Sequence, residues 1–288
     1  MKKPFLTLEK AKEITAKYPT PIHVYDEKGI IDNARELTKA FSWNKGYKEY
    51  FAVKATPNPK IIKILKNEGC GVDCASYTEL LMAEALGFKG DEIMFSSNET
   101  APEEYQLARK LNAIINLDDI THIDFLNDVA SIPEKICLRF NPGGKFTINN
   151  QIMGSPADAK YGITRTQMTK AIKKLQKLGV KEFGIHSFLA SNTMGNEYYP
   201  KLAKIVFETM VELYEETGAH FAFANLSGGI GVPYRPDQKK NDIFVISDGV
   251  RKAYEDTIEK SEINNIALYT ELGRYMLAPY GHLLTTAI

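Results

Sequence analysis

Lys54 is the residue with the clearest potential for covalent chemistry. It lies in the run YFAVKA (residues 50–55), an apolar segment typical of a buried strand, which places one amino group at the strand's carboxyl end. A lysine in such a position can be desolvated enough to lose its proton and attack an aldehyde, forming a Schiff base. Because most lysines are exposed, the competing interpretation is a side chain that reaches from the strand end into water.

A glycine-rich segment later in the chain could bind a phosphate. The run NLSGGIGVPY (225–234) directly follows a predicted strand and contains Gly228, Gly229 and Gly231 within four positions. Glycines let backbone N–H groups approach a phosphate closely, and in barrels the phosphate site often lies in the loops after strands seven and eight. The alternative is a tight turn with no ligand.

The run TELGRY (270–275) ends the last predicted strand with three residues of interest. Arg274 could grip a phosphate or a carboxylate in a bidentate fork, and Glu271 could hold a proton on a ring nitrogen. Gly273 lies between them. The alternative is a surface ion pair, which is less favoured here because a phosphate-type loop is expected at the same barrel mouth.

The run GIHSFLASN (184–192) combines one histidine, two hydroxyl groups and an aromatic ring at a strand end. A flat cofactor would need a ring to stack against its face and a hydroxyl to reach its phosphate. A single histidine beside a strand is more often structural than catalytic. His186 and Ser191 are therefore candidates only.

Asp73 follows another predicted strand in the run VDCAS (72–76). Its carboxylate could pair with Lys54 and help to set the pKa of that lysine. The same segment has a structural explanation, because Ser76 and Glu79 form the pattern of a capping box that starts a helix.

The elements that must position these residues alternate along the chain. Short apolar strands, as expected for parallel strands buried on both faces, are separated by amphipathic helices. Eight such units predict an α/β fold, a (β/α)8 TIM barrel with its site in the loops after the strands. The predicted strands are 48–54, 71–75, 92–96, 113–117, 135–140, 182–187, 221–226 and 266–270, and the helices include 59–67, 76–86, 102–111, 165–178 and 200–217.

Two strand-like segments do not belong to the barrel. One lies before the barrel and is separated from it by a helix (30–41), and the other lies after the barrel. We expect them to be edge strands of a second, mostly missing β domain, and because the second segment would still need strand partners, we expect a truncated chain. The predicted strands are 21–26 and 280–288, and the divisions are 1–29 for the β-domain part, 30–278 for the barrel and 279–288 for the start of the C-terminal domain.

The composition favours a small-molecule ligand. The 288 residues carry 36 Lys and Arg against 36 Asp and Glu, so no net charge attracts nucleic acid or an anionic membrane. Charges interrupt the apolar stretch near the N-terminus, and no run is long enough to span a membrane, which predicts a cytoplasmic protein. The spacing of Cys70 and Cys74 is not that of a zinc or redox pair, so with Cys137 they are expected to be buried and reduced, and no metal is expected.

Four segments together resemble the barrel-plus-β-domain decarboxylases that use pyridoxal 5'-phosphate, and most of all the diaminopimelate decarboxylases. The segments occur in the order typical of that family and span the whole barrel. They are FAVKA (51–55), DCAS (73–76), GGIG (228–231) and ELGRY (271–275).

The resemblance implies a role for each candidate. Lys54 would form the Schiff base with the cofactor, and Glu271 would pair with the pyridine nitrogen. The Gly228–Gly231 loop and the backbone of Gly273 and Arg274 would bind the phosphate, and Arg274 would also meet the carboxylate of an amino-acid substrate. Asp73, His186 and Ser191 complete the expected cofactor site. A homodimer with shared active sites is implied as well.

Three departures from the family pattern stand out. Phe188 occupies the position where the family usually has a histidine stacked on the cofactor; a phenyl ring can stack but cannot share a proton. Leu272 replaces a usual proline. The C-terminal domain that in this family supplies a cysteine, an acidic residue and a tyrosine to the partner's site has no counterpart in this sequence, so we expect this chain to bind the cofactor weakly or not at all and to decarboxylate poorly.

Several functions remain open from sequence alone. The expected reaction converts meso-diaminopimelate to lysine and carbon dioxide, but lysine, ornithine, arginine and carboxynorspermidine are alternative substrates. A racemase of the same fold would need a second acid-base group opposite the lysine. A barrel that only holds pyridoxal phosphate would lack the two terminal strands.

Overall fold

Eight parallel strands close into a barrel in this computed structural model, which describes residues 5–145 and 155–287. Each barrel strand is hydrogen-bonded to the next, and β10 pairs with β2 to complete the ring. The predicted (β/α)8 barrel and its eight strands are confirmed. The strands are β2 (Lys48–Ala52), β3 (Gly71–Cys74), β4 (Ile93–Phe95), β5 (Ile114–Leu117), β6 (Lys135–Asn141), β8 (Glu182–His186), β9 (Phe221–Asn225) and β10 (Ala267–Thr270), and the short β7 (Ile163–Thr164) pairs with β6.

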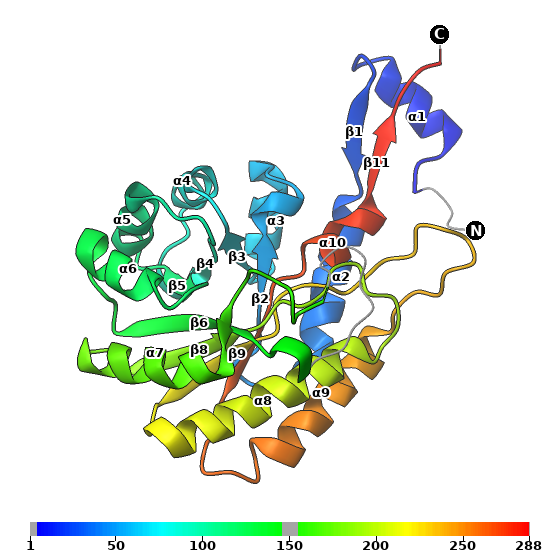
Figure 1. Ribbon diagram of the computed structural model, residues 1–288. Helices are drawn as coiled ribbons and strands as arrows, with labels where there is room; N and C mark the ends of the chain where they lie inside the picture. Colours follow the sequence, from blue (N-terminus) through cyan, green and yellow to red (C-terminus); the bar gives the residue numbers. More distant parts are fainter. Residues whose placement is uncertain (1–4, 146–154, 288) are drawn as a thin grey trace.

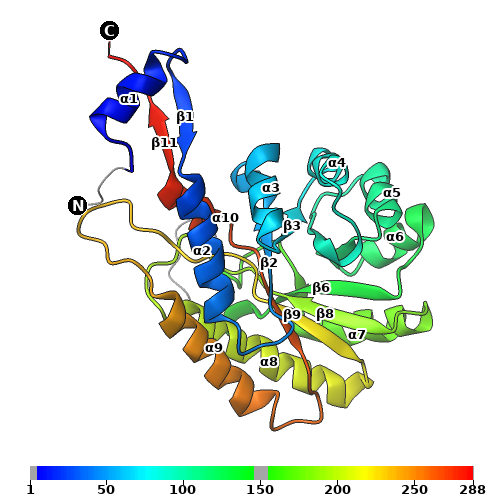
Figure 2. The ribbon, with the colours of Figure 1, turned by 180° about the vertical axis from the view of Figure 1, so that it is seen from behind.

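Helices surround the barrel, and their ends follow local sequence signals (Figures 1 and 2). At the start of α3, the Asn58 side chain accepts a hydrogen bond from Lys60 N at 3.0 Å, and Pro59 occupies the first helical turn. Gly218 ends α8 with a left-handed backbone, φ 63°. The helices are α1 (Leu8–Thr15), α2 (Glu27–Ala40), α3 (Pro59–Asn67), α4 (Tyr77–Ala85), α5 (Pro102–Lys110), α6 (His122–Ala130), α7 (Arg165–Lys177), α8 (Tyr198–Thr217), α9 (Ile243–Thr257) and α10 (Gly273–Leu277), with short 3₁₀ turns η1 (Val53–Ala55), η2 (Gly90–Glu92), η3 (Gly143–Lys145) and η4 (Ala278–Tyr280).

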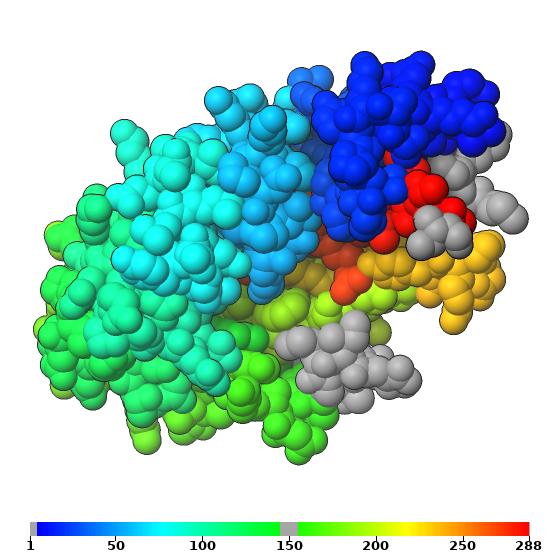
Figure 3. All heavy atoms as spheres, turned by 90° about the horizontal axis from the view of Figure 1, so that it is seen from above, coloured from blue at the N-terminus to red at the C-terminus, as the bar shows by residue number. Residues whose placement is uncertain are grey.

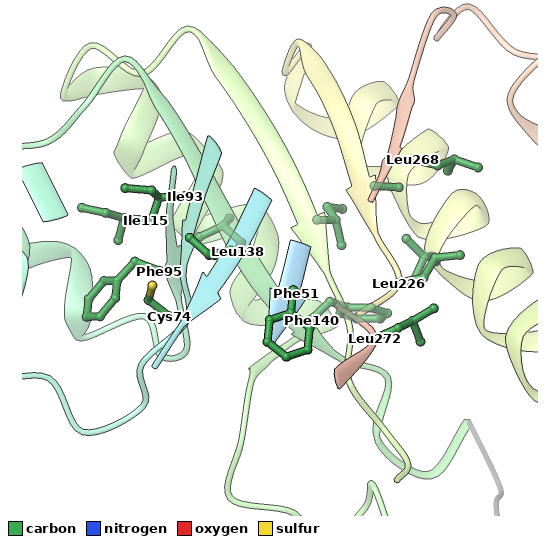
Figure 4. Packing of buried hydrophobic residues seen from close by; sticks show 14 of the residues in the cluster. Phe51, Cys74, Ile93, Phe95, Ile115, Leu138, Phe140, Leu226, Leu268 and Leu272 are labelled. Carbon is green, nitrogen blue, oxygen red and sulfur yellow. The ribbon is translucent and has the colours of Figure 1, made fainter. Parts of the chain in front are cut away.

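The core has two parts, because successive side chains of a strand point to opposite faces. Apolar residues from strands all around the barrel, including Phe51 and Leu268, are shown in Figure 4. A smaller group formed by Tyr50, Met94, Ile114, Cys137 and Phe223 makes a separate cluster. The three cysteines are free and buried, as predicted.

The two segments outside the barrel pair with each other. β1 (Ile22–Tyr25) and β11 (Gly281–Leu284) form an antiparallel ladder in which Ile22 lies opposite Leu284. With α1 they project from the barrel on one side (Figures 1 and 2). Both predicted strands are found, although β11 is shorter than 280–288, and Ile288 lies outside the described residues. The assignment of these strands to a second domain, and the boundaries proposed for it, stay predictions.

Candidate active site

A cavity of about 560 Å³ opens at the carboxyl ends of the barrel strands. This volume is within the usual range for small-molecule sites. The walls come from Asp73 on β3, from the turns after β2, β8, β9 and β10, and from the β1–β11 pair, whose dark blue and red residues lie side by side in Figure 3. Eight of the predicted site residues line it: Lys54, Asp73, Ser191, Gly228, Gly229, Glu271, Gly273 and Arg274.

Lys54 lies in the turn η1 directly after β2, because the strand ends at Ala52 and not at Lys54 as predicted. Its Nζ lies 5.9 Å from the centroid of the Phe188 ring. The side chain is exposed, so the expected desolvation by this chain's own packing is wrong. What the fold supplies is placement: the amino group stands in the cavity wall beside an aromatic ring.

Glu271 is the electrostatic centre of the site. It is buried, and its carboxylate accepts hydrogen bonds from Asn225 Nδ2 at 2.7 Å, Ser227 Oγ at 2.8 Å and His186 Nε2 at 3.1 Å. Burial acts to raise the pKa of Glu271, but the His186 charge and these hydrogen bonds outweigh it and lower the pKa to about 2. Glu271 is therefore an ionised carboxylate that is buried from solvent.

The glycine-rich loop after β9 is fixed from both sides. Asn225 Oδ1 accepts a hydrogen bond from Ser227 N at 2.8 Å, which holds Ser227 in a left-handed backbone with φ 55°. Thr193 N donates to Gly229 O at 2.8 Å, and Gly231 N donates to Thr193 O at 2.9 Å. The loops after β8 and β9 thus form one wall of the cavity.

Three glycines permit close backbone approaches around this wall. A Cβ on Gly228 would lie 2.7 Å from Glu271 O, and a Cβ on Gly229, whose φ is +116°, would lie 2.6 Å from Ala190 O. A Cβ on Gly273 would lie 2.7 Å from the Cβ of Ala55, the residue after Lys54. Side chains at these positions would push the three turns apart.

Asp73 is a buried acid with one oxygen, Oδ1, that has no hydrogen-bond partner among the described residues. Burial raises the pKa of Asp73 well above its usual range, and the Glu271 charge raises it further, while the Lys54 charge acts in the opposite direction. This favours a protonated Asp73. The charge of Lys54 acts on the pKa of Asp73, although no ion pair between the two is found within residues 5–145 and 155–287, and the hypothesis that Asp73 pairs with Lys54 and sets its pKa stays a prediction.

His186 and Arg274 are held in different ways, and the roles expected for them stay predictions. His186 does not line the cavity but lies behind Glu271, as a buried donor to its carboxylate. The Arg274 side chain is exposed and donates a hydrogen bond to the hydroxyl of Tyr234. Ser191 lies in the cavity wall, where a hydroxyl could reach a ligand.

Arg139 on β6 was not singled out by any sequence motif, yet it supports the aromatic wall. Its guanidinium lies 4.8 Å from the Tyr161 ring centroid and 6.0 Å from that of Phe188. Asp118 fixes it by an ion pair of 2.7 Å in which both side chains are largely buried. Phe188 therefore has two cations near its ring, Lys54 from the turn after β2 and Arg139 from β6.

Residues 27–278 match the family described as pyridoxal-dependent decarboxylase, pyridoxal binding domain. The chain belongs to this decarboxylase family. Protein TabA of Pseudomonas amygdali pv. tabaci is 34% identical over 276 residues, which cover 96% of this chain and 64% of TabA. A diaminopimelate decarboxylase of Methanothermobacter thermautotrophicus is 27% identical, with the same coverage of both chains.

The fold is also that of solved members of the decarboxylase family. The crystal structure of diaminopimelate decarboxylase from Methanocaldococcus jannaschii in complex with L-lysine has a TM-score of 0.84 and 26% identity to this chain. The match covers 95% of this chain and 65% of that one. This chain thus spans less than two thirds of the length of these relatives.

The cavity fits pyridoxal phosphate, the cofactor of this decarboxylase family. An ionised carboxylate offers about four lone-pair directions, and Glu271 uses three of them for donors of this chain. One direction is left for the N–H of a pyridine ring. The space at Gly228 and Gly229, which a Cβ would fill, allows backbone to approach a phosphate, and Lys54 offers an amine to the aldehyde.

Gly228→Ala is expected to weaken pyridoxal phosphate binding by about tenfold or more, because its Cβ would collide with Glu271 O and displace the loop. The measurement is an absorbance titration with the cofactor. Gly144→Ala is the matched control, because the nearest atom to its Cβ, on Ala157, is 3.9 Å away. Equal affinities of the two variants would show that the loop does not contact the phosphate.

The donors that surround Glu271 could not have been assigned from sequence patterns. Asn225 and Ser227 lie in the glycine-rich segment that indicated a phosphate site, but their side chains turn toward Glu271 instead. Their position directly before the glycines was the available signal. Arg139 had none, because an arginine inside a strand pattern reads as an ordinary polar residue.

Proposed function

We propose that this protein is a pyridoxal-phosphate-dependent amino-acid decarboxylase that releases carbon dioxide from meso-diaminopimelate and forms lysine. The observation that carries the proposal is the convergence of Lys54, Glu271 and the glycine wall on one cavity. Family membership supports the cofactor and the reaction class. The relatives named as diaminopimelate decarboxylases, one of them in complex with L-lysine, support the substrate.

Lys54 and Glu271 would have different roles toward the bound cofactor. When bound, pyridoxal phosphate supplies an aldehyde that holds the substrate amine and a protonated ring that takes up the electron pair left when the carboxylate departs. Lys54 Nζ would be the amine that holds the cofactor through this aldehyde. Glu271, which is ionised because its pKa is lowered to about 2, would hold the proton on the ring nitrogen.

Two further side chains orient the substrate and the ring. Phe188 offers a flat face that stacks without exchanging a proton, and Arg139 holds that face in place. Arg274 would receive the substrate carboxylate through N–H groups other than the one donated to Tyr234. Lys54 is exposed at the open side of the cavity, which is consistent with a homodimer whose second subunit covers the site.

The test is carbon dioxide release by the purified protein with added pyridoxal phosphate, measured in D₂O. We expect kcat/KM for meso-diaminopimelate to exceed that for lysine, ornithine, arginine and carboxynorspermidine by about tenfold or more. One deuterium should appear at the former carboxylate-bearing carbon of the product. Deuterium in recovered substrate without carbon dioxide would identify a racemase, and cofactor binding with neither reaction would identify a cofactor-holding barrel.

A further inference from the structure

Glu49 is a buried carboxyl group that has no part in the chemistry proposed above. It lies on β2, is 3% exposed and does not line the active-site cavity. Its Oε1 accepts a hydrogen bond from Leu272 N at 2.7 Å, and its Oε2 accepts one from Thr270 Oγ1 at 2.5 Å. These two partners are the residues on either side of Glu271. Glu49 therefore holds both neighbours of the carboxylate at the centre of the site.

The contact lies where the backbone pairing of two site-bearing strands stops. The β2–β10 ladder pairs Tyr269 with Lys48 and Thr270 with Glu49, and no later pair is formed among the described residues. Beyond this point β2 leads to Lys54 and β10 leads to Glu271. The Glu49 side chain takes the Leu272 N–H and so continues the connection by one further bond.

The turn that carries Glu271 packs tightly against the turn that carries Lys54. A Cβ on Gly273 would lie 2.7 Å from the Cβ of Ala55 and 3.2 Å from that of Ala52. A small shift of the Leu272 backbone would therefore either open this contact or close it into a clash. The bond from Glu49 fixes the position of that backbone.

The hydrogen bond between Glu49 and the Thr270 hydroxyl can form in either protonation state of Glu49. Burial raises the pKa of Glu49 to about 8, against the effect of its two hydrogen bonds. The protonated acid can donate to Thr270 Oγ1, and the ionised form accepts from it, while Tyr47 OH lies 2.8 Å from the same Oγ1. The titratable groups that interact with Glu49 are Tyr47, Cys70, Asp73, Tyr199, Glu271 and Tyr275.

We propose that Glu49 is a positioning residue that sets the placement of Glu271 and Gly273 relative to Lys54, by holding the Leu272 N–H and the Thr270 hydroxyl from the neighbouring strand. The inference rests on the proposed function, because its consequence is measured on the cofactor. It predicts that the acceptor oxygen at position 49, more than the charge, sets cofactor affinity and turnover.

The test compares Glu49→Met, which removes the acceptor, with Glu49→Gln, which keeps it. We expect Glu49→Met to weaken pyridoxal phosphate binding and to lower kcat, each by about tenfold or more, and Glu49→Gln to stay within about threefold of the original protein for both. Glu182→Gln is the control, since this strand carboxylate pairs with Lys135 instead. If Glu49 only stabilised the fold, Glu49→Met would lower Tm but leave cofactor affinity and kcat unchanged in the folded protein.

A pH series and a second variant keep the proposal falsifiable. Because its folded-state pKa is raised, Glu49 should make the original protein lose stability as pH rises from about 4.5 to about 8, and Glu49→Gln should reduce that slope in Tm. If Glu49→Met does not fold, Glu49→Asp replaces it, since the shorter side chain withdraws the acceptor. Absence of a lysine-bound cofactor in the original protein would refute the proposed function, whereas its equal formation in Glu49→Met would refute only the role of Glu49.

Discussion

Lys54→Ala is expected to lower the rate of carbon dioxide release by about a thousandfold or more, because the variant has no amine to bind the cofactor aldehyde and release it to the substrate. Cofactor held only by its phosphate and ring contacts should still enter the cavity. The variant should therefore retain weakened binding while losing the visible absorption of lysine-bound pyridoxal phosphate. The measurements are single-turnover kinetics and an absorbance titration.

The same variant allows the attachment point to be mapped. Borohydride reduction of the loaded protein followed by peptide mass spectrometry should find the pyridoxyl group on the peptide that contains Lys54. Lys63→Ala is a matched control, because Lys63 is an exposed lysine on the neighbouring α3. It should keep full activity and full labelling. A retained absorption band in Lys54→Ala would refute the assignment of Lys54.

Glu271→Gln is expected to lower kcat by about a hundredfold to a thousandfold while leaving the cofactor attached, because a neutral amide cannot hold the proton on the ring nitrogen by charge. The amide NH₂ would also face either Asn225, the donor to Oε1, or His186 and Ser227, the donors to Oε2. Ser227→Ala is the graded control, because it removes one donor and keeps the carboxylate. It should cost less than tenfold in kcat.

The ionisation of Glu271 also has a signature in stability. Its folded pKa of about 2 lies below the ordinary value of 4.5, so its contribution to stability is present above pH 4.5 and is lost as pH falls toward 2. The loss of Tm over this range should therefore be smaller in Glu271→Gln than in the original protein. An unchanged kcat in Glu271→Gln would show that another group controls the ring proton.

The fold was predictable because its signals are local. Each short apolar strand is bounded by an amphipathic helix, and a chain that repeats this unit eight times can bury both faces of its parallel strands by closing into a barrel. The strand that carries Phe51 and the helix that Asn58 and Pro59 start follow from neighbouring residues alone. The pairing of β1 with β11 does not follow from neighbouring residues, because more than 250 residues separate Ile22 from Leu284 in the chain.

The type of chemistry at the site could also be predicted from the sequence. In a parallel barrel all strands end at the same face, so a lysine, a glutamate and a glycine-rich loop placed after different strands must share one mouth. That rule places Lys54, Glu271 and Gly228 at one mouth from the sequence alone, and all three line one cavity. It says nothing about which way each side chain turns within that mouth.

Only the tertiary structure decided the state of each group. Whether a carboxyl group is ionised depends on burial and on hydrogen-bond donors from strands distant in sequence. Glu271 has three donors and is charged. Asp73 has one oxygen without a donor among the described residues, and its raised pKa favours the acid form. The sequence alone determined the barrel, the cofactor class and the residues at its mouth, because these follow from local pattern and strand order. Contacts across the barrel determined the exposure of Lys54, the donors to Glu271 and the bond from Glu49 to Leu272, because they depend on register and side-chain direction.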